Sequence, residues 1–76
     1  MFYKTTSNGA KYCEFYYVND IGHPKKIQVF EKENGKYPFT LWDMVHGEWC
    51  GSGHRTPEEL NDFFKHYRID ANVPDN

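Results

Sequence analysis

The sequence predicts an α+β fold, in which an antiparallel β-meander of four to five strands carries one C-terminal helix packed on one face. Two Asn-Gly turns, at residues 8–9 and 34–35, separate segments that are rich in strand-forming residues. A helix-capping signal at Thr56 then precedes an apolar stripe with helical spacing. The 76 residues are enough for a single small domain spanning 1–76, and too few for a two-domain enzyme or a dinucleotide-binding fold.

Together with a longer turn at residues 19–24, the two Asn-Gly turns divide the first half of the chain into three predicted strands, at residues 2–6, 10–18 and 25–32. Because side chains alternate along a strand, Cys13, Phe15 and Tyr17 share one face of residues 10–18. The other face of that segment carries Tyr12, Glu14, Tyr16 and Val18. In residues 25–32, apolar and polar side chains alternate in the same way. This pattern is typical of a sheet with one wet face.

Two further strands are expected before the helix. Residues 37–46 form the fourth, with Pro38 at its start, where a missing backbone N–H does least harm. Residues 48–54 contain two glycines and are predicted as a short fifth strand with a bulge near Gly51. A loop that leads into the helix is the alternative for this segment.

The helix is predicted to begin after Thr56, with Pro57 at its first position and acidic residues in its first turn. One apolar stripe follows, made of Leu60, Phe63, Phe64 and Tyr67. Phe63 and Phe64 should close the apolar face of the sheet. The helix should end near residues 68–69, and residues 70–76 are expected to be a flexible tail.

Composition and charge narrow the classes of function. The chain has six Phe, six Tyr and two Trp, more rings than so small an interior usually hides. Surplus Tyr and Trp serve either as contact residues or as half-buried cover on an open sheet. Residues 1–36 carry a net positive charge and residues 37–76 a net negative one, for a total of −2. A general nucleic-acid binder would carry a net positive charge.

The cellular setting is expected to be the cytoplasm, with no membrane association. Residues 1–6 lack the apolar core of a signal peptide, and no apolar run is long enough to span a bilayer. Cys13 and Cys50 are therefore expected to be free thiols, although a disulfide between them stays open.

No specific catalytic or metal motif stands out. His46, Cys50 and His54 have suitable chemistry for zinc or for a Cys–His nucleophile, but their four-residue spacing does not match a zinc knuckle. The glycines at 51 and 53 precede a helix N-terminus, where Glu58 and Glu59 would repel a phosphate. We therefore expect no enzyme activity, no cofactor and no metal.

The favoured function is a non-enzymatic protein-binding module, in the form of a phage or mobile-element inhibitor or adaptor that acts on a host protein, such as a host-defence antagonist. Its contact surface would combine aromatic anchors with an acidic surface. The candidate residues are Trp42, Trp49, Tyr16, Asp43, Glu48, Glu58, Glu59 and Asp62. An alternative of equal weight is that the acidic residues of the helix form only a solvated face that keeps the protein soluble. The oligomeric state, including a homodimer, is left open.

The alternative is a single-strand or duplex nucleic-acid binder that uses the second hairpin. That hairpin carries Lys25, Lys26, Lys32 and Lys36, with Tyr12, Tyr16 and Phe30 as stacking rings. Interleaved acids there, at residues 14, 31 and 33, should cancel much of the field. The meander-plus-helix outline is similar to that of small DNA-binding arm domains and of many phage-encoded proteins, but no family motif is matched.

Overall fold

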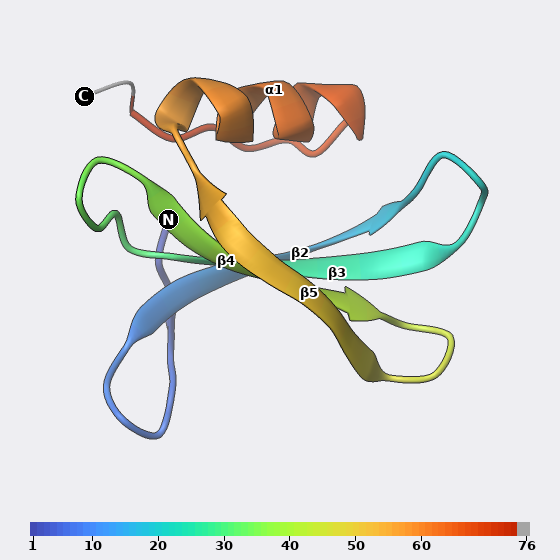
Figure 1. The fold of residues 1–76 in the computed structure, drawn as a ribbon, viewed down its shortest axis with the longest axis horizontal. Coiled ribbons are helices and arrows are strands. Elements are labelled where there is room, and N and C mark those ends of the chain that lie inside the picture. The colour runs from blue at the N-terminus through green and yellow to red at the C-terminus, as the bar shows by residue number, and fades with distance from the viewer. Residues whose placement is uncertain (75–76) are drawn as a thin grey trace.

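The structure, a computed structural model, describes residues 1–74 and shows a five-stranded antiparallel sheet with one helix (Figure 1). The elements are β1 (Lys4–Thr5), β2 (Lys11–Val18), β3 (Pro24–Phe30), β4 (Tyr37–Asp43), β5 (Glu48–Arg55) and α1 (Pro57–His66). Each strand pairs with its neighbour in sequence, in the order β1-β2-β3-β4-β5. The predicted α+β meander with a single C-terminal helix is therefore confirmed.

The turns follow the predicted chemistry. Asn34 and Gly35 have φ of 51° and 79°, a left-handed pair that Asn and Gly adopt at low cost. Glu33 and Lys36 flank this pair and exchange two backbone hydrogen bonds, of 2.7 and 3.1 Å. The Glu33–Lys36 pair is one residue out of register with the β3–β4 ladder, which pairs Val29 with Phe39. The strand therefore ends at Phe30, although the third strand was predicted to continue to residue 32.

The fourth strand was predicted to continue to residue 46, but β4 ends at Asp43. The Asp43 carboxylate accepts a hydrogen bond from the Val45 backbone N–H at 3.0 Å, which favours a turn over an extended strand. Gly47, with φ of 70°, completes the turn before β5 begins.

The helix begins with a complete capping box. Thr56 Oγ1 accepts a hydrogen bond from Glu59 N at 3.2 Å, and Glu59 Oε1 accepts one from Thr56 N at 2.9 Å. These bonds favour the ionised carboxylate and lower the pKa of Glu59. The helix ends at His66, slightly earlier than predicted, because Arg68 has φ of 56° and cannot continue it.

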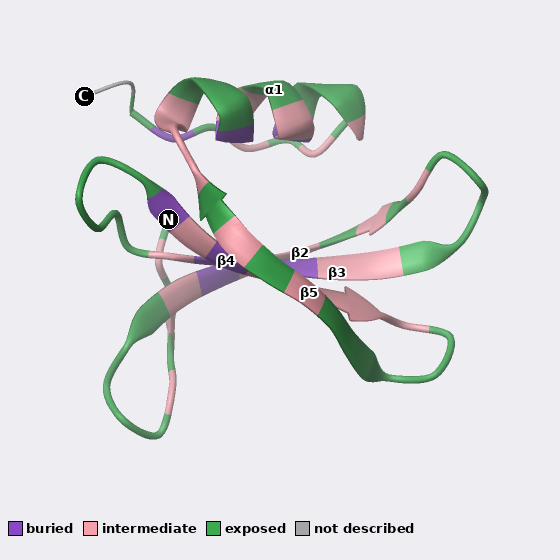
Figure 2. Ribbon diagram, viewed as in Figure 1, coloured by how far each residue is buried: buried purple, intermediate pink, exposed green. Residues whose placement is uncertain are grey.

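The core lies between α1 and one face of the sheet. Leu60 and Phe64 are its fully buried helix residues, and they face Cys13, Ile27 and Val29 of the sheet. The side of α1 that faces the sheet is buried or intermediate, and its outer side is exposed (Figure 2). Phe63 and Phe64 were both predicted to close the apolar face of the sheet, but only Phe64 is fully buried, and Phe63 is half-buried.

After α1 the chain returns along the helix toward its N-terminal end (Figure 1). A flexible tail was predicted over residues 70–76. Over residues 70–74 the structure instead shows a packed segment, in which Val73 is buried and its backbone is hydrogen-bonded by the Asn61 side chain. Residues 75–76 lie outside the described residues.

Strand β5 contains a bulge, as predicted. Leu41 pairs with Gly51, but the next residue of β4, Trp42, pairs with Trp49. Cys50 is therefore the extra residue, directly before the predicted Gly51. Among residues 1–74, no helix is long and apolar enough to cross a membrane.

Candidate functional site

No helix or strand of residues 1–74 covers the face of the sheet opposite α1, and we call it the open face. Strand alternation and register assign its residues. They are Lys4 of β1, Tyr12, Glu14, Tyr16 and Val18 of β2, Pro24, Lys26, Gln28 and Phe30 of β3, Pro38, Thr40 and Trp42 of β4, and Trp49, Ser52 and His54 of β5. The sequence predicted this set for β2, but did not establish which face the helix covers.

Four of these residues form a line across the sheet, which we call the cross-strand row. Tyr16 pairs with Lys26, Lys26 with Trp42, and Trp42 with Trp49. With neighbouring strands about 4.8 Å apart, the row extends over roughly 14 Å. Tyr16 is 63% exposed and Trp49 58% exposed. The structure thus brings together the three predicted aromatic site residues.

The bulge at Cys50 is what places Trp49 in this row. In a regular ladder Trp42 would pair with Cys50, and Trp49 would then point to the helix side of the sheet. The extra residue shifts the alternation of side chains by one position, so that Trp49 lies on the same face as Trp42, the open face. The bulge thus sets the direction of the Trp49 side chain, and bulges are known to redirect side chains in this way.

A polar network supports the centre of the row. Gln28 Nε2 donates to Glu14 Oε1 at 3.1 Å, and Gln28 Oε1 accepts hydrogen bonds from Thr40 Oγ1 at 3.0 Å and Trp42 Nε1 at 3.2 Å. The indole N–H is also 3.2 Å from Thr40 Oγ1. Every side chain of this hydrogen-bond network has a partner, so the orientation of Trp42 is set before any ligand binds.

Glu14 anchors the network as a carboxylate. Its oxygens lie 3.6 Å from Lys4 Nζ and 3.6 Å from Lys26 Nζ. Burial alone would raise the pKa of Glu14, but the hydrogen bond from Gln28 and the charges of Lys26 and Lys4 outweigh it and lower the pKa. Lys26 Nζ also lies 5.1 Å from the centre of the Trp42 ring, within cation–π range.

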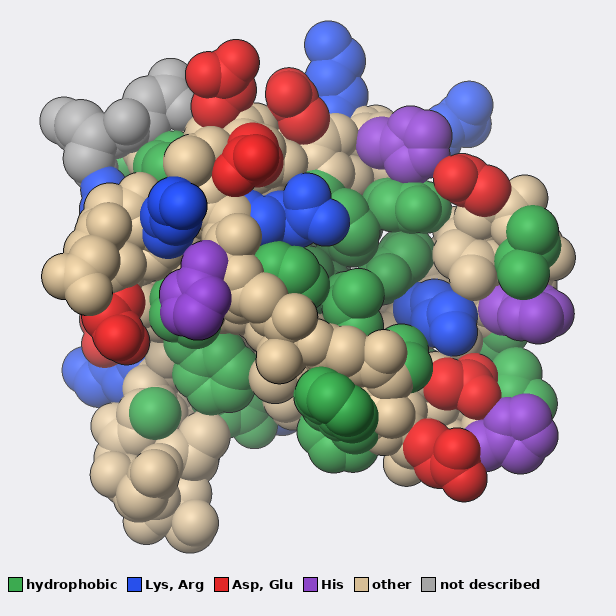
Figure 3. Space-filling view, viewed as in Figure 1, with side chains coloured by type: hydrophobic (Ala, Val, Ile, Leu, Met, Phe, Trp, Pro, Cys, Tyr) green, Lys and Arg blue, Asp and Glu red, His purple; other side chains and the backbone are tan. Residues whose placement is uncertain are grey.

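The predicted acidic residues do not form one surface. Asp43 and Glu48 pair with each other at the β4–β5 turn, next to the row. Glu58 and Asp62 are exposed on α1, and Glu59 there serves the capping box. Acidic side chains are visible over α1 at the top of Figure 3, on the side of the sheet away from the open face.

The Lys-rich hairpin of the alternative prediction is also divided. Lys25 and Lys26 are consecutive in β3, so their side chains leave opposite faces of the sheet. Lys32 Nζ lies 5.8 Å from the Tyr37 ring centre, and Tyr37 belongs to the helix-side core. Of the four lysines, the open face therefore holds only Lys26. Lys4 joins it there, because it pairs with Tyr12. The sequence predicted a strand over residues 2–6 but gave no register that would place Lys4 on this face.

The predicted metal and thiol candidates stand apart. His46 Nδ1 is 2.8 Å from Asp43 Oδ2 in the β4–β5 turn, and His54 pairs with Pro38 at the other end of β5. The hydrogen bond with His46 contributes most to lowering the pKa of Asp43. Within residues 1–74, no three His, Cys, Asp or Glu side chains are grouped to hold a metal ion.

The two cysteines are free thiols in very different settings. Cys13 is buried in the core, and Cys50 is exposed at the bulge. Burial raises the pKa of the Cys13 thiol to about 11, so it is a poor nucleophile near neutral pH.

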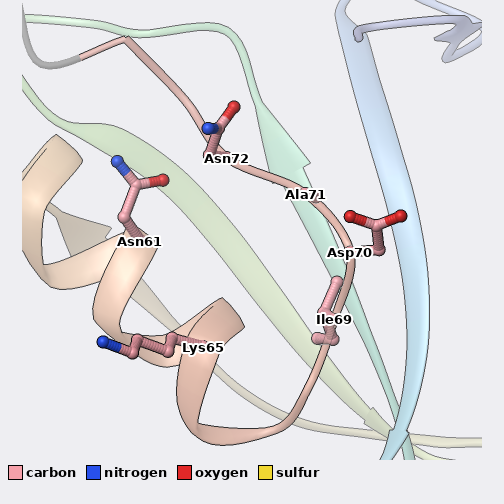
Figure 4. Close-up of a pocket in the computed structure, with 6 residues that line it drawn as sticks. All are labelled: Asn61, Lys65, Ile69, Asp70, Ala71 and Asn72. Atoms are coloured by element: carbon pink, nitrogen blue, oxygen red, sulfur yellow. The ribbon is translucent and has the colours of Figure 1, made fainter.

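A pocket of about 460 Å³ lies between α1 and the returning segment (Figure 4). It is lined by Asn61, Lys65, Ile69, Asp70, Ala71 and Asn72. Asn61 already bonds the Val73 backbone, and Lys65 and Asp70 are the ionisable groups of the lining, which contains no hydroxyl, thiol or imidazole beside them. The open face is therefore the best candidate for a functional surface.

Comparison with known proteins adds no identity: no family model, no curated protein and no solved structure matches this chain.

Proposed function

We propose that this chain is a non-enzymatic protein-binding module whose contact surface is the open face, centred on the cross-strand row. The observation that carries the proposal is the alignment of Tyr16, Trp42 and Trp49 across three strands, with two of them more than half exposed. Trp and Tyr dominate the binding energy of protein interfaces because they bury large areas with few rotatable bonds.

Preorganisation supports this use. Trp42 is held by Gln28 and Thr40, and Lys26 is held by Glu14 and the Trp42 ring. Ordering a flexible side chain on binding costs about 0.5–1.5 kcal/mol, and these two central residues of the row, already held in place, avoid much of that cost.

The surroundings of the row favour a protein partner. Exposed Val18, Ile21 and Val45 lie on or beside the two neighbouring turns at this end of the sheet. A backbone hydrogen bond from Met44 N to Pro24 O, at 3.1 Å, holds these turns together. Aliphatic side chains add apolar area against a protein, but they offer no stacking plane to a nucleic acid base.

We further propose that the module acts as an inhibitor or adaptor on a host protein, in the manner of a phage or mobile-element product, by covering a surface of its partner. This form needs only a preformed face and no reactive group. We place it in the cytoplasm, because an exposed free thiol at Cys50 suits a reducing compartment.

The test compares capture of proteins from host lysate by the wild-type chain, by Trp49→Ala and by Lys65→Ala. Both substituted side chains are exposed, but Trp49 belongs to the row and Lys65 lies on α1, on the other side of the sheet. We expect a captured protein to be lost with Trp49→Ala, with at least about 2 kcal/mol of affinity removed, and kept with Lys65→Ala. Equal capture by all three proteins would contradict the proposal.

A nucleic-acid partner is the second candidate, because the open face also carries the Tyr12–Phe30 ring pair, with centroids 5.3 Å apart, beside Lys4 and Lys26. Both lysines are already paired with Glu14, which leaves little charge for phosphates. A gel shift on single- and double-stranded probes decides between the candidates. Binding that weakens steeply with salt and disappears in Lys26→Glu would favour this second function.

A further inference from the structure

Strand β5 forms an edge of the sheet that nothing in the described part of the chain pairs with. It bonds β4 on one side, and as the last strand of the sheet order it has no strand on its other side. Figure 1 shows β5 in front of the other strands. At the opposite edge, β1 pairs with part of β2, and the Tyr3 hydroxyl donates a hydrogen bond to the Glu14 carbonyl at 3.0 Å. An open edge is a template for another strand.

The pairing of β5 with β4 assigns each β5 residue to a face. Trp49, Ser52 and His54 pair with open-face residues of β4, or lie in phase with them. Glu48, Gly51, Gly53 and Arg55 belong to the helix side. Cys50 is the extra residue of the bulge and has no partner in β4. Without Cys50, helix-side and open-face residues alternate along β5, and this alternation is symmetric about Ser52.

We propose that β5 pairs antiparallel with β5 of a second copy, about a two-fold axis at Ser52. Ser52 then lies opposite Ser52 of the second copy, and Gly51 lies opposite its Gly53. With Cys50 bulged out, Trp49 lies opposite His54 and Glu48 opposite Arg55. In every pair both residues belong to the same face, which a continuous ladder requires.

Charge complementarity favours a second copy as the occupant. The two ends of β5 carry opposite charges, at Glu48 and Arg55. The two-fold axis places Glu48 of each copy opposite Arg55 of the other, so that two such pairs form. Within residues 1–74 neither residue forms an ion pair of its own. Arg55 stacks between the Phe39 and Phe63 rings, and its buried Nε has no hydrogen-bond partner. An opposite charge directly across the strand pair is the stabilising arrangement.

The centre of the edge is also clear of side-chain bulk. Gly51 carries no side chain, and glycine in a strand often marks a place where another backbone approaches closely. The pairing would join two open faces into one continuous surface. It uses the strand edge and not the face itself, so it stands or falls separately from the proposed protein-binding function.

A cysteine cross-link tests the register. In a Cys50→Ser background, Ser52→Cys places two thiols on the axis, where opposed Cβ atoms are about 4.5–5.5 Å apart, close to disulfide geometry. The matched control is His54→Cys, on the same strand and face, whose two copies would be about 13 Å apart along the strand. With oxidised glutathione as the oxidant, we expect Ser52→Cys to form a disulfide dimer about tenfold or more faster than the control.

Charge reversal provides a second readout without new thiols. Sedimentation should show a dimer for the wild type, a monomer for Glu48→Lys, and a dimer for Glu58→Lys, an exposed acid away from the edge. Circular dichroism confirms that each variant folds. A wild type that stays monomeric at millimolar concentration, or equal cross-linking of the two cysteine variants, would overturn the proposal.

Discussion

The Asn61 side chain brackets the backbone of Val73 with two hydrogen bonds. Val73 N donates to Asn61 Oδ1 at 2.7 Å, and Asn61 Nδ2 donates to Val73 O at 2.9 Å. The amide thus replaces a strand partner for one residue and fastens the returning segment to the middle of α1. The Val73 side chain is consequently held in the core.

Asn61→Ala should remove this attachment. Two partly buried backbone groups would lose their partners, so we expect the free energy of unfolding to fall by about 1–3 kcal/mol. Urea titration measures the change. Asn72→Ala is the control, because Asn72 is exposed on the same segment. Equal effects of the two substitutions would show that the attachment contributes nothing.

Phe64→Ala and Phe63→Ala should differ, although the residues are adjacent. Phe64 is fully buried and packs edge-on against Phe15, with ring centroids 5.3 Å apart. Its loss should cost about 3–5 kcal/mol. Phe63 is only half-buried, so its loss should cost clearly less. Guanidinium titrations of both variants give the comparison, and the reverse ranking would show that α1 is not docked as described.

Deletion of Cys50 should leave Trp49 in the cross-strand row. Without the extra residue, β5 can form a regular ladder in which Trp49 still pairs with Trp42 and Gly51 with Leu41. NMR contacts between the Trp49 and Trp42 rings should therefore be kept in the deletion variant. Cys50→Ser retains the bulge and should keep the same contacts. A Trp49 ring that contacts helix-side residues after the deletion would show that Cys50 is not the extra residue of the ladder.

Stability should fall with acid in part through Glu14. The folded-state pKa of Glu14 is lowered from 4.5, so the unfolded chain binds a proton at a higher pH than the folded one. This contribution is therefore present above the unfolded pKa and is lost as pH falls through the folded pKa. Urea titrations between about pH 7 and about pH 3 should show a shallower loss for Glu14→Gln than for the wild type. Glu58→Gln, on the exposed side of α1, should follow the wild type.

The two thiols should react at different stages of unfolding. A thiol reagent should label Cys50 in the native protein, because it is exposed at the bulge. Cys13 has a raised pKa of about 11 and is fully buried, so it should react only when the sheet opens. Mass spectrometry counts the labels over time. Simultaneous labelling of both cysteines would indicate that the core opens readily.

Local chemistry predicted most of the fold. The left-handed turn at Asn34, the alternation in β2 and the capping box at Thr56 are each determined by residues close in sequence. The strand ends were less accurate, since Asp43 closes a turn through a hydrogen bond that no periodicity reveals. The returning segment was missed for a similar reason, because Val73 is a single apolar residue without a pattern around it.

The candidate site was predicted only in part. The aromatic residues could be named, but the row depends on register across four strands and on the exact position of a bulge. Gln28 was read as a polar member of a wet face, and Glu14 as an acid that cancels the field of the hairpin lysines, whereas they form the support beneath Trp42. A polar residue at each central position of neighbouring strands was the available signal, and it becomes meaningful only once the register is known.

The strictly sequential strand order also has a kinetic consequence. Each ladder closes over a short turn, so little chain entropy is lost in forming it, and topologies of this kind fold quickly for a β-rich protein. The contact between Phe15 and Phe64 is different, because it joins β2 to α1 across most of the chain. The sheet can therefore assemble hairpin by hairpin, and docking of the helix is the step that must wait for distant residues to meet.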